Sequence, residues 1–326
     1  MIRYPFILTD LAHVGSQGLA VSDESWFQDE LALCREWNFP IKIDDDGRVR
    51  IGYDDEMLIP CRVQQEAPAI AWNGLRVSGF LRLDSTNREA CDQARAGASE
   101  GTLIYSETQT AGKGRLDRDW FSAAGKGVYI SLILRPIQPW KYWPILTHVA
   151  AVALIDALKS VERGMKFPKT LDVDLKWPND VLLAGKKCAG ILLETLTPDE
   201  KNAAAIVGVG INVHHGSVPE ELADAAACVD DAAGVVVPRR RLLILFLKHF
   251  QSVYQLFQKG KFEEILEKWK SFSSMWNGAP VTLFESGRTR NAVTCGLDGI
   301  GALRVRLEDG SVETLLAGDV RVRSAE

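Results

Sequence analysis

Alternation of apolar and charged residues marks one short segment near the middle of the chain. Val173 and Leu175 alternate with charged residues before this segment, and the apolar run 191–193 follows it. Two such runs joined by a short turn predict a β-hairpin. Its first strand would end at 182–183, and its tip would lie at 184–185.

Two lysines, Lys176 and Lys187, lie on this predicted hairpin together with Asn179. An ammonium group is compact and strongly hydrated, so its burial without an anion is unfavourable. A hairpin that gathers these three side chains therefore indicates a site for an anionic ligand. The alternative is a solvated loop that happens to carry lysines, and the segment alone does not separate the two interpretations.

The hydrophobic pattern from about 66 to 270 mixes strand and helix spacing. Strands are expected at 81–84, 103–106, 128–134 and 204–213, and helices at 87–96, 145–161, 241–257 and 262–272. Ser85 or Thr86 would cap the first of these helices. Gly208 and Gly210 lie inside a predicted strand, which is typical of a place where a ligand or another backbone comes close.

From about residue 276 the pattern changes to short runs separated by turns. These runs are expected as strands at 281–284, 290–294, 303–307 and 312–315. Glu308-Asp309-Gly310 is a strong turn signal between the last two. Short strands with close turns predict a small β-barrel in this part of the chain.

The first 65 residues are acidic. They hold six Lys and Arg against twelve Asp and Glu, a net charge of −6, which leaves +1 for the remainder. A helical pattern at 30–37 and a ribbon at 41–52 suggest the remnant of a winged helix. The segment 22–30, where a DNA-reading helix would lie, is acidic, whereas phosphate contacts need Lys or Arg. DNA binding is therefore not expected.

Composition narrows the setting of the protein. The 326 residues are 46% hydrophobic and 25% charged, which is ordinary for a soluble globular protein with more than one domain. Six cysteines are scattered without a C-x-x-C pair, which favours reduced thiols in the cytoplasm over disulfides or zinc. The start has no signal-peptide pattern. His148 and Asp156 interrupt the longest apolar stretch, 145–158, so no membrane span is expected.

The histidines do not predict a metal site. His214 and His215 are the only adjacent pair among the five. Neighbouring side chains on a strand point to opposite faces, so the pair would not hold one ion.

A second group of polar residues forms the loop 107–120. Gly112 and Gly114 would leave backbone amides accessible, and the loop also carries the cations Lys113, Arg115 and Arg118. Amides and guanidinium groups together suit a phosphate chain. The loop is neither a Walker loop nor a dinucleotide fingerprint. Flexible surface loops often have the same composition, so this loop alone does not establish binding.

Five elements in order resemble the bacterial biotin–protein ligases, also called biotin–[acetyl-CoA-carboxylase] ligases. They are Asp84-Ser85-Thr86-Asn87; Gly112-Lys113-Gly114-Arg115 with Trp120; Lys176-Trp177-Pro178-Asn179-Asp180; Gly185-Lys186-Lys187 with Gly190-Ile191-Leu192-Leu193-Glu194; and Gly208-Val209-Gly210-Ile211-Asn212. The resemblance covers roughly residues 78–326. It implies an α+β fold with a class II-synthetase-like mixed or antiparallel sheet and helices at 66–273. An SH3-like barrel would follow at 274–326, and a degenerate winged-helix-like domain would precede at 1–65.

The resemblance also implies an activity. Family members make biotinyl-5′-AMP from biotin and Mg²⁺-ATP, and then transfer biotin to one lysine of a biotin carboxyl carrier protein. The biotin carboxylate attacks the α-phosphorus directly, so positioning and charge stabilisation carry the rate. Two alternatives are a lipoate–protein ligase and a biotin-responsive transcriptional regulator with weak ligase activity. Relatives form dimers, so a homodimer is an inherited expectation.

The resemblance assigns roles at the two ends of biotin. Ser85, Thr86 and Gln109 match positions that hydrogen-bond the head group, a urea ring that needs paired donors and acceptors. Lys187 matches the lysine at the biotin carboxylate, and Lys176 would face the ATP phosphates. The expected catalytic residues are Lys187, Lys176, Asp180 and Arg115.

The remaining matched residues are expected to bind the nucleotide or to close the site. Trp120, Asn179 and Asn212 match the ATP side, and the loop around Lys113 and Gly114 would close over the adenylate. The complete expected binding set is Ser85, Thr86, Asn87, Gln109, Gly112, Lys113, Gly114, Arg115, Arg118, Trp120, Asn179, Lys187, Gly190, Gly208 and Asn212.

Two residues depart from the family loop, which commonly reads G-R-G-R-x-G-R. Lys113 replaces its first arginine and Asp117 replaces a later glycine. Lysine keeps the charge but loses bidentate geometry, and Asp117 adds negative charge beside the intermediate. We hypothesise that the adenylate is held less tightly than in arginine-bearing relatives.

Overall fold

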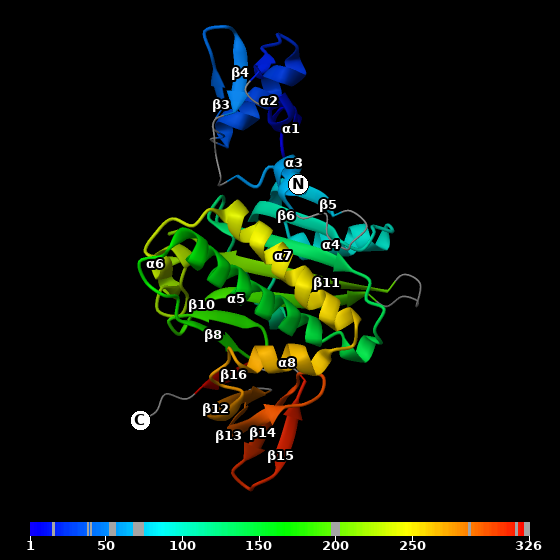
Figure 1. Ribbon diagram of the computed structural model, residues 1–326, viewed down its shortest axis with the longest axis vertical. Helices are drawn as coiled ribbons and strands as arrows, with labels where there is room; N and C mark the ends of the chain where they lie inside the picture. Colours follow the sequence, from blue (N-terminus) through cyan, green and yellow to red (C-terminus); the bar gives the residue numbers. More distant parts are fainter. Residues whose placement is uncertain are drawn as a thin grey trace.

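The computed structural model describes residues 1–14, 17–37, 39, 41–51, 57–67, 75–196, 203–285, 288–316 and 319–322. The molecule is elongated, with a small N-terminal unit at one end, a sheet covered by helices in the middle and a C-terminal β-domain at the other end (Figure 1). Among the described residues, no helix is long and apolar enough to cross a membrane.

Eight strands form the central sheet, in the order β1-β5-β6-β7-β11-β10-β9-β8. Their bounds are β1 Ile2–Arg3, β5 Arg76–Leu83, β6 Thr102–Gln109, β7 Gly127–Leu134, β8 Val173–Lys176, β9 Asp180–Leu183, β10 Lys186–Leu196 and β11 Ala204–Asn212. β5 and β6 run parallel, and all other neighbours are antiparallel. The sheet is therefore mixed, which confirms the fold expected from the sequence.

Helices cover both faces of this sheet. α4 (Thr86–Arg95) packs on one face, against β6, β7 and β11. α5 (Ile145–Met165) and α7 (Arg239–Gln258) lie side by side on the other face, and α8 (Phe262–Lys270) packs across their ends next to the C-terminal strands (Figure 1). The central strands β7 and β11 are thus buried on both sides, and they read as nearly continuous apolar runs.

Element ends are where the sequence was least informative. α5 continues four residues beyond its expected end at 161 and stops at Lys166, whose φ of 53° is left-handed. Residues 162–164 are polar or glycine and lie mostly at the surface, so the apolar period that marks the helix is lost before the helix ends.

Five antiparallel strands form the C-terminal β-domain, in the order β15-β14-β13-β12-β16. Their bounds are β12 Asn277–Glu285, β13 Arg288–Leu297, β14 Leu303–Leu307, β15 Val312–Leu315 and β16 Asp319–Val322. Four of these strands were expected, and β16 was missed. Trp177 donates its indole N–H to the Gly301 carbonyl at 3.0 Å, which ties this domain to the central one.

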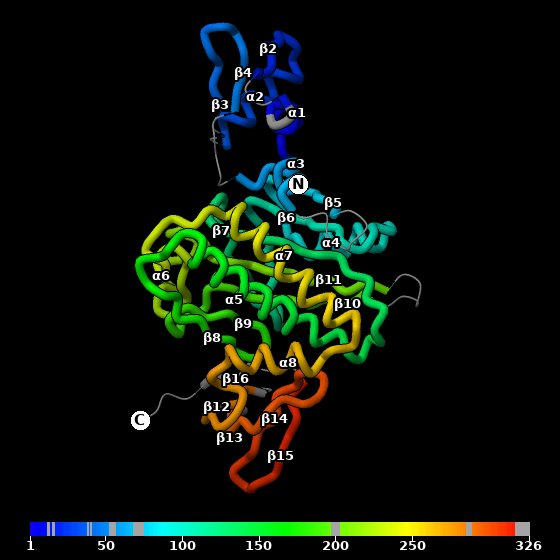
Figure 2. The backbone as a smooth tube through the Cα atoms, in the orientation of Figure 1, coloured from blue at the N-terminus to red at the C-terminus, as the bar shows by residue number. Residues whose placement is uncertain are grey.

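In its described residues the N-terminal unit holds the helices α1 and α2 and a three-stranded sheet in the order β2-β4-β3. Its elements are α1 Phe6–Val14, β2 Leu19–Ala20, α2 Ser25–Glu36, β3 Ile41–Ile43 and β4 Arg48–Ile51, and α3 Pro60–Glu66 returns the chain to the central sheet (Figure 2). The expected ribbon is confirmed as β3 and β4. The chain nevertheless begins in the central sheet, because β1 pairs with β5. The boundary at residue 65 stays a prediction.

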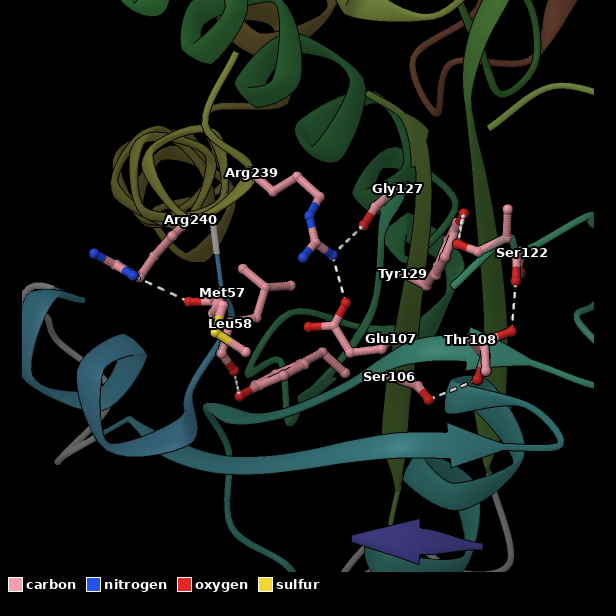
Figure 3. A network of polar contacts seen from close by, with 12 residues as sticks. Met57, Leu58, Ser106, Glu107, Thr108, Ser122, Gly127, Tyr129, Arg239 and Arg240 are labelled. Atoms are coloured by element: carbon pink, nitrogen blue, oxygen red, sulfur yellow. Dashed lines mark hydrogen bonds and ion pairs between the residues drawn. The ribbon is translucent and has the colours of Figure 1, made fainter. Parts of the chain in front are cut away.

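A buried polar network joins the N-terminal unit to the central domain (Figure 3). Tyr4 donates its hydroxyl hydrogen to Glu107 on β6, and Arg239 donates to the other oxygen of the same carboxylate at 2.5 Å. The neighbouring Arg240 donates to the Met57 carbonyl at 3.1 Å. The side chains of Arg239 and Glu107 are only 5% and 7% exposed, so this pair is shielded from water.

Candidate active site

One cavity collects most of the residues singled out from the sequence. It lies between the start of α4, the loop after β6 and the hairpin of β8, β9 and β10. Its lining residues are Ser85, Thr86, Asn87, Gln109, Lys113, Gly114, Arg115, Leu116, Arg118, Asp119, Trp120, Ile130, Lys176, Trp177, Pro178, Asn179, Asp180, Lys187, Gly190, Ile191, Leu192, Gly208, Val209 and Gly210. Segments more than a hundred residues apart in the sequence thus line one space.

Two expected residues do not line this cavity. Gly112 packs against another part of its own loop: its carbonyl accepts a hydrogen bond from Trp120 N at 2.9 Å, and a Cβ there would lie 2.5 Å from the Trp120 carbonyl oxygen. Asn212 ends β11 opposite Gly127. Its role on the ATP side therefore has no support from the cavity and stays a prediction.

The start of α4 forms a polar end of the cavity. Thr86 N donates to Gln109 Oε1 at 2.8 Å, and Gln109 Nε2 donates to Ser122 Oγ at 2.9 Å. Ser85 occupies the N-cap position but makes no capping hydrogen bond through its side chain, so the expected cap is wrong for this residue. Gln109 instead satisfies the first helical N–H, which leaves the Ser85 hydroxyl available to a ligand.

The hairpin of β9 and β10 places the charged side chains of Lys187 and Asp180 in the cavity. Lys187 Nζ lies 2.7 Å from Asp180 Oδ1 and 5.3 Å from the centroid of the Trp120 ring. Register explains this meeting, because Lys187 pairs with Leu182 and Asp180 lies two residues before Leu182 on the same antiparallel strand, which makes Lys187 and Asp180 diagonal neighbours. The two interpretations of the segment are thereby separated: Lys187 lines a cavity and does not simply extend into solvent.

Asn179 holds the turn before β9 against β10. Its Nδ2 donates to the Ile191 carbonyl at 2.8 Å, and Ile191 N donates back to the Asn179 carbonyl at 2.9 Å. Arg115 donates to Asn179 Oδ1 at 3.4 Å, so the glycine-rich loop reaches across to the hairpin. The loop and the hairpin therefore line one cavity together.

Comparisons with known proteins agree with this geometry. A model of the Biotin/lipoate A/B protein ligase family matches residues 79–212. The "Bifunctional ligase/repressor BirA" of Bacillus subtilis is 34% identical over 242 residues, which are 74% of this chain and 72% of that protein. The chain belongs to the Biotin/lipoate A/B protein ligase family.

Other members of the family give the same picture. The "Biotin--[acetyl-CoA-carboxylase] ligase" of Mycobacterium tuberculosis is 34% identical over 64% of this chain and 73% of that protein. The structure of a biotin protein ligase from Aquifex aeolicus in complex with biotin and ATP superposes with a TM-score of 0.62 at 29% identity, covering 77% of this chain and 99% of that one. The resemblance inferred from the five elements is confirmed.

The strand glycines are explained by the side chains that lie against them. A Cβ at Gly210 would lie 2.5 Å from Cε2 of Trp120, and a Cβ at Gly190 would lie 3.0 Å from its Cζ3. The indole therefore rests directly on the backbone of β10 and β11. Its buried Nε1 has no hydrogen-bond partner in the described part of the chain, so it can donate to a ligand.

Gly210→Ala should displace the Trp120 indole, because the added methyl group occupies the place of the ring. We expect kcat/KM for adenylate formation to fall by about 10- to 100-fold, since small misplacements in a site cost this much. Isotope exchange between pyrophosphate and ATP measures it. Gly299→Ala is the control, because its Cβ would meet nothing within 4 Å. Equal rates in the two variants would contradict the packing role.

The glycine-rich loop is closed by its own backbone. Gly114 N donates to the Arg118 carbonyl at 2.7 Å, and Lys113 pairs with Asp119 in an antiparallel bridge. Asp117 has a φ of 54°, a left-handed conformation that glycine adopts without strain. The glycine common in the family thus fits this position, and Asp117 costs some backbone strain as well as adding charge.

Sequence reasoning missed some groups of the site. Trp177 belongs to a matched element but to neither expected set of site residues; it is 2% exposed and lines the cavity beside Pro178. Ser131, buried on β7, bonds to residues of the α4 start. A lone serine within the apolar run 128–134 was the available signal, because a buried hydroxyl needs a partner.

The histidine pair was placed wrongly. β11 ends at Asn212, so His214 and His215 lie beyond the strand. His214 Nδ1 lies 2.8 Å from Asp230 Oδ2, whereas the His215 side chain is 91% exposed. Among the described residues, no group of three or more His, Cys, Asp or Glu side chains could hold a metal ion.

Cys188 lies next to Lys187 but is not suited to covalent catalysis. Burial raises the pKa of its thiol to about 12, so the thiol stays protonated at neutral pH. The chemistry of the cavity therefore rests on positioned charges and hydrogen bonds.

Proposed function

We propose that this protein activates biotin with ATP to biotinyl-5′-AMP and transfers biotin to a lysine of a biotin carboxyl carrier protein. The observation that supports this most is the cavity itself, which places the Lys187 ammonium and the hydroxyl- and amide-bearing start of α4 in one space. One end suits a carboxylate and a phosphate, and the other suits a neutral polar head group. Membership of the biotin ligase family agrees with both.

The first step forms a mixed anhydride. A carboxylate oxygen of biotin attacks the α-phosphorus of ATP, and the bond from that phosphorus to pyrophosphate breaks. Lys187 would neutralise the carboxylate and then the acyl phosphate, and Lys176 would face the departing phosphates. Mg²⁺ would enter with ATP as part of the substrate, since Mg²⁺ binds mainly to phosphates, water and one or two carboxylates.

The second step transfers biotin to the carrier. The neutral amine of the acceptor lysine attacks the acyl carbon, AMP leaves and the new amide loses one proton. Asp180, whose Oδ1 lies 2.7 Å from Lys187 Nζ, would orient the incoming amine. Closure of the loop around Arg115 would protect the adenylate from water.

One experiment tests the function. The protein is incubated with Mg²⁺, ATP, biotin and an apo-carrier domain, and lysine biotinylation is followed by the mass of the carrier. A parallel reaction contains lipoate. Incorporation of lipoate in place of biotin would favour the lipoate ligase alternative, and modification with neither would defeat the proposal.

The N-terminal unit is proposed to act without DNA. The residues before and along α2 include Asp23, Glu24, Asp29 and Glu30, and such a helix repels phosphates. We expect no biotin-dependent mobility shift with a biotin-operon operator, which speaks against the regulator alternative. A homodimer and a cytoplasmic location also stay proposals, supported by relatives and by free cysteines respectively.

Asp117→Gly and Lys113→Arg, each made singly, should slow the release of labelled biotinyl-AMP by about threefold to tenfold. The first removes a negative charge and a left-handed strain, and the second restores bidentate geometry. Asp224→Gly, which removes an exposed carboxylate outside the cavity, is the control. If the wild type releases biotinyl-AMP as slowly as the two variants do, the hypothesis that it holds the adenylate loosely is refuted.

A further inference from the structure

A chain of hydrogen bonds lies behind the polar end of the cavity. It starts at Glu194 on β10, whose Oε2 accepts from Asn87 Nδ2 at 2.7 Å. Ser131 Oγ on β7 lies 2.6 Å from Asn87 Oδ1 and 2.9 Å from Thr86 Oγ1. Asn87 and Thr86 are each 4% exposed and Ser131 is fully buried, so water does not compete for these groups.

The orientation of the Asn87 amide follows from its neighbours. The carboxylate of Glu194 and the carbonyl of Leu192, 3.5 Å away, can only accept hydrogen bonds. The amide nitrogen must therefore face them, and Oδ1 must face Ser131. Gly208 leaves the room for this, because a Cβ there would lie 2.1 Å from Asn87 Oδ1.

The direction of the remaining bonds then has no freedom. A hydroxyl group has one hydrogen, and Ser131 gives its hydrogen to Asn87 Oδ1, which only accepts. The 2.9 Å contact between Ser131 Oγ and Thr86 Oγ1 still needs a hydrogen, and that hydrogen comes from the Thr86 hydroxyl, because Ser131 has given its own away. The lone pairs of Thr86 Oγ1 then remain for a ligand.

We propose that Glu194 is a positioning residue that determines head-group specificity. Because Glu194 orients Asn87, the Thr86 hydroxyl can only accept a hydrogen bond from a ligand, and the cavity therefore selects a head group with an N–H donor. The cyclic urea of biotin has N–H groups. The dithiolane ring of lipoate has none, so it would leave the buried Thr86 oxygen without a hydrogen bond. This inference rests on the proposed function and adds a reason why biotin is preferred to lipoate.

Glu194 is exposed enough to be replaced without disturbing the core. In Glu194→Lys the side chain can only donate, which leaves the Leu192 carbonyl, at the long distance of 3.5 Å, as the acceptor that opposes a turn of the Asn87 amide. We expect the amide to turn over, so that Ser131 accepts from its nitrogen and gives its own hydrogen to Thr86 Oγ1. The Thr86 hydrogen is then released toward the ligand. Calorimetry should then show a Kd for biotin raised about tenfold, with the Kd for ATP within twofold. Glu194→Gln is the matched control, because its amide oxygen still accepts from Asn87, and its Kd for biotin should stay within twofold.

A second comparison tests the direction of the bonds. Biotin analogues in which one ring N–H is replaced by oxygen lose a donor. At least one of the two isomers should bind the wild type about tenfold more weakly than biotin, and in Glu194→Lys this ratio should fall toward one. A merely structural role for Glu194 would leave the ratio unchanged.

Ser131→Ala breaks the same chain at its centre and should also weaken biotin binding. Ser106→Ala is its control, since Ser106 is equally buried but bonds to the Thr108 carbonyl outside the chain. Equal biotin affinities in Glu194→Lys and Glu194→Gln, or an unchanged analogue ratio, would overturn the inference. A wild type that binds biotin but modifies no carrier would defeat the proposed function alone, and one that binds no biotin would overturn both.

Discussion

Lys187→Ala should lower kcat/KM for adenylate formation by about 10²- to 10³-fold, the usual effect of removing one group that stabilises charge in a transition state. Negative charge develops where the biotin carboxylate meets the α-phosphorus. Lys187 is the hairpin ammonium paired with Asp180 at 2.7 Å, and it lies above the Trp120 ring. Exchange of labelled pyrophosphate into ATP in the presence of biotin measures this step.

The adjacent lysine offers a matched control. Lys186 Nζ donates to the Ala223 carbonyl at 2.7 Å and does not line the cavity, so Lys186→Ala should keep adenylate formation within about twofold of the wild type. Since both variants remove the same charge from the same strand, a difference between them reports position and not net charge. Equal losses in the two variants would contradict the role of Lys187.

Arg239→Met should lower the free energy of unfolding by about 3–5 kcal/mol, because it leaves the Glu107 carboxylate buried without its cation. Arg239 donates to Glu107 at 2.5 Å and also to the Gly127 carbonyl at 3.2 Å. Tyr4 donates to the same carboxylate, so the docking of β1 should loosen with it. Denaturant titration measures the stability, and limited proteolysis of the first residues measures the docking.

An exposed ion pair between an arginine and a glutamate provides the control for this prediction. Arg290 and Glu313 of the C-terminal domain are 38% and 39% exposed and 2.8 Å apart. Arg290→Met should therefore cost only about 0.2–1 kcal/mol. The double variant Arg239→Met with Glu107→Gln should recover part of the loss, because no buried charge remains. If Arg239→Met costs no more than Arg290→Met, the buried pair does not hold the N-terminal unit in place.

Local signals in the sequence predicted much of the fold. The hairpin was correct to the residue, with β9 ending at Leu183 and β10 beginning at Lys186. Turn chemistry and strand alternation are properties of neighbouring residues, so they can be read without a structure. Helix ends were less accurate, as α5 shows, because the apolar period fades where a helix leaves the core.

Contacts between distant segments could not be predicted in this way. β1 has only two residues, Ile2 and Arg3, which is too few for a pattern that would predict its pairing with β5. Glu107 and Arg239 are 132 residues apart, and the sequence around neither residue indicates that they form an ion pair. The role of Asn212 stays a prediction, since a matching element places it in the site and Asn212 is not among the residues that line the cavity.

The sequence by itself determined most strands and helices of the central domain, the residue types gathered on the hairpin and the glycine-rich loop, and through five ordered elements the family. These depend on residue type and short spacing. Only the tertiary structure decided which groups meet: Trp120 against Gly210, and Glu194 with Asn87 and Ser131. The direction of a hydrogen-bond chain depends on which acceptors surround a buried amide, and that is set when α4, β7 and β10 pack together.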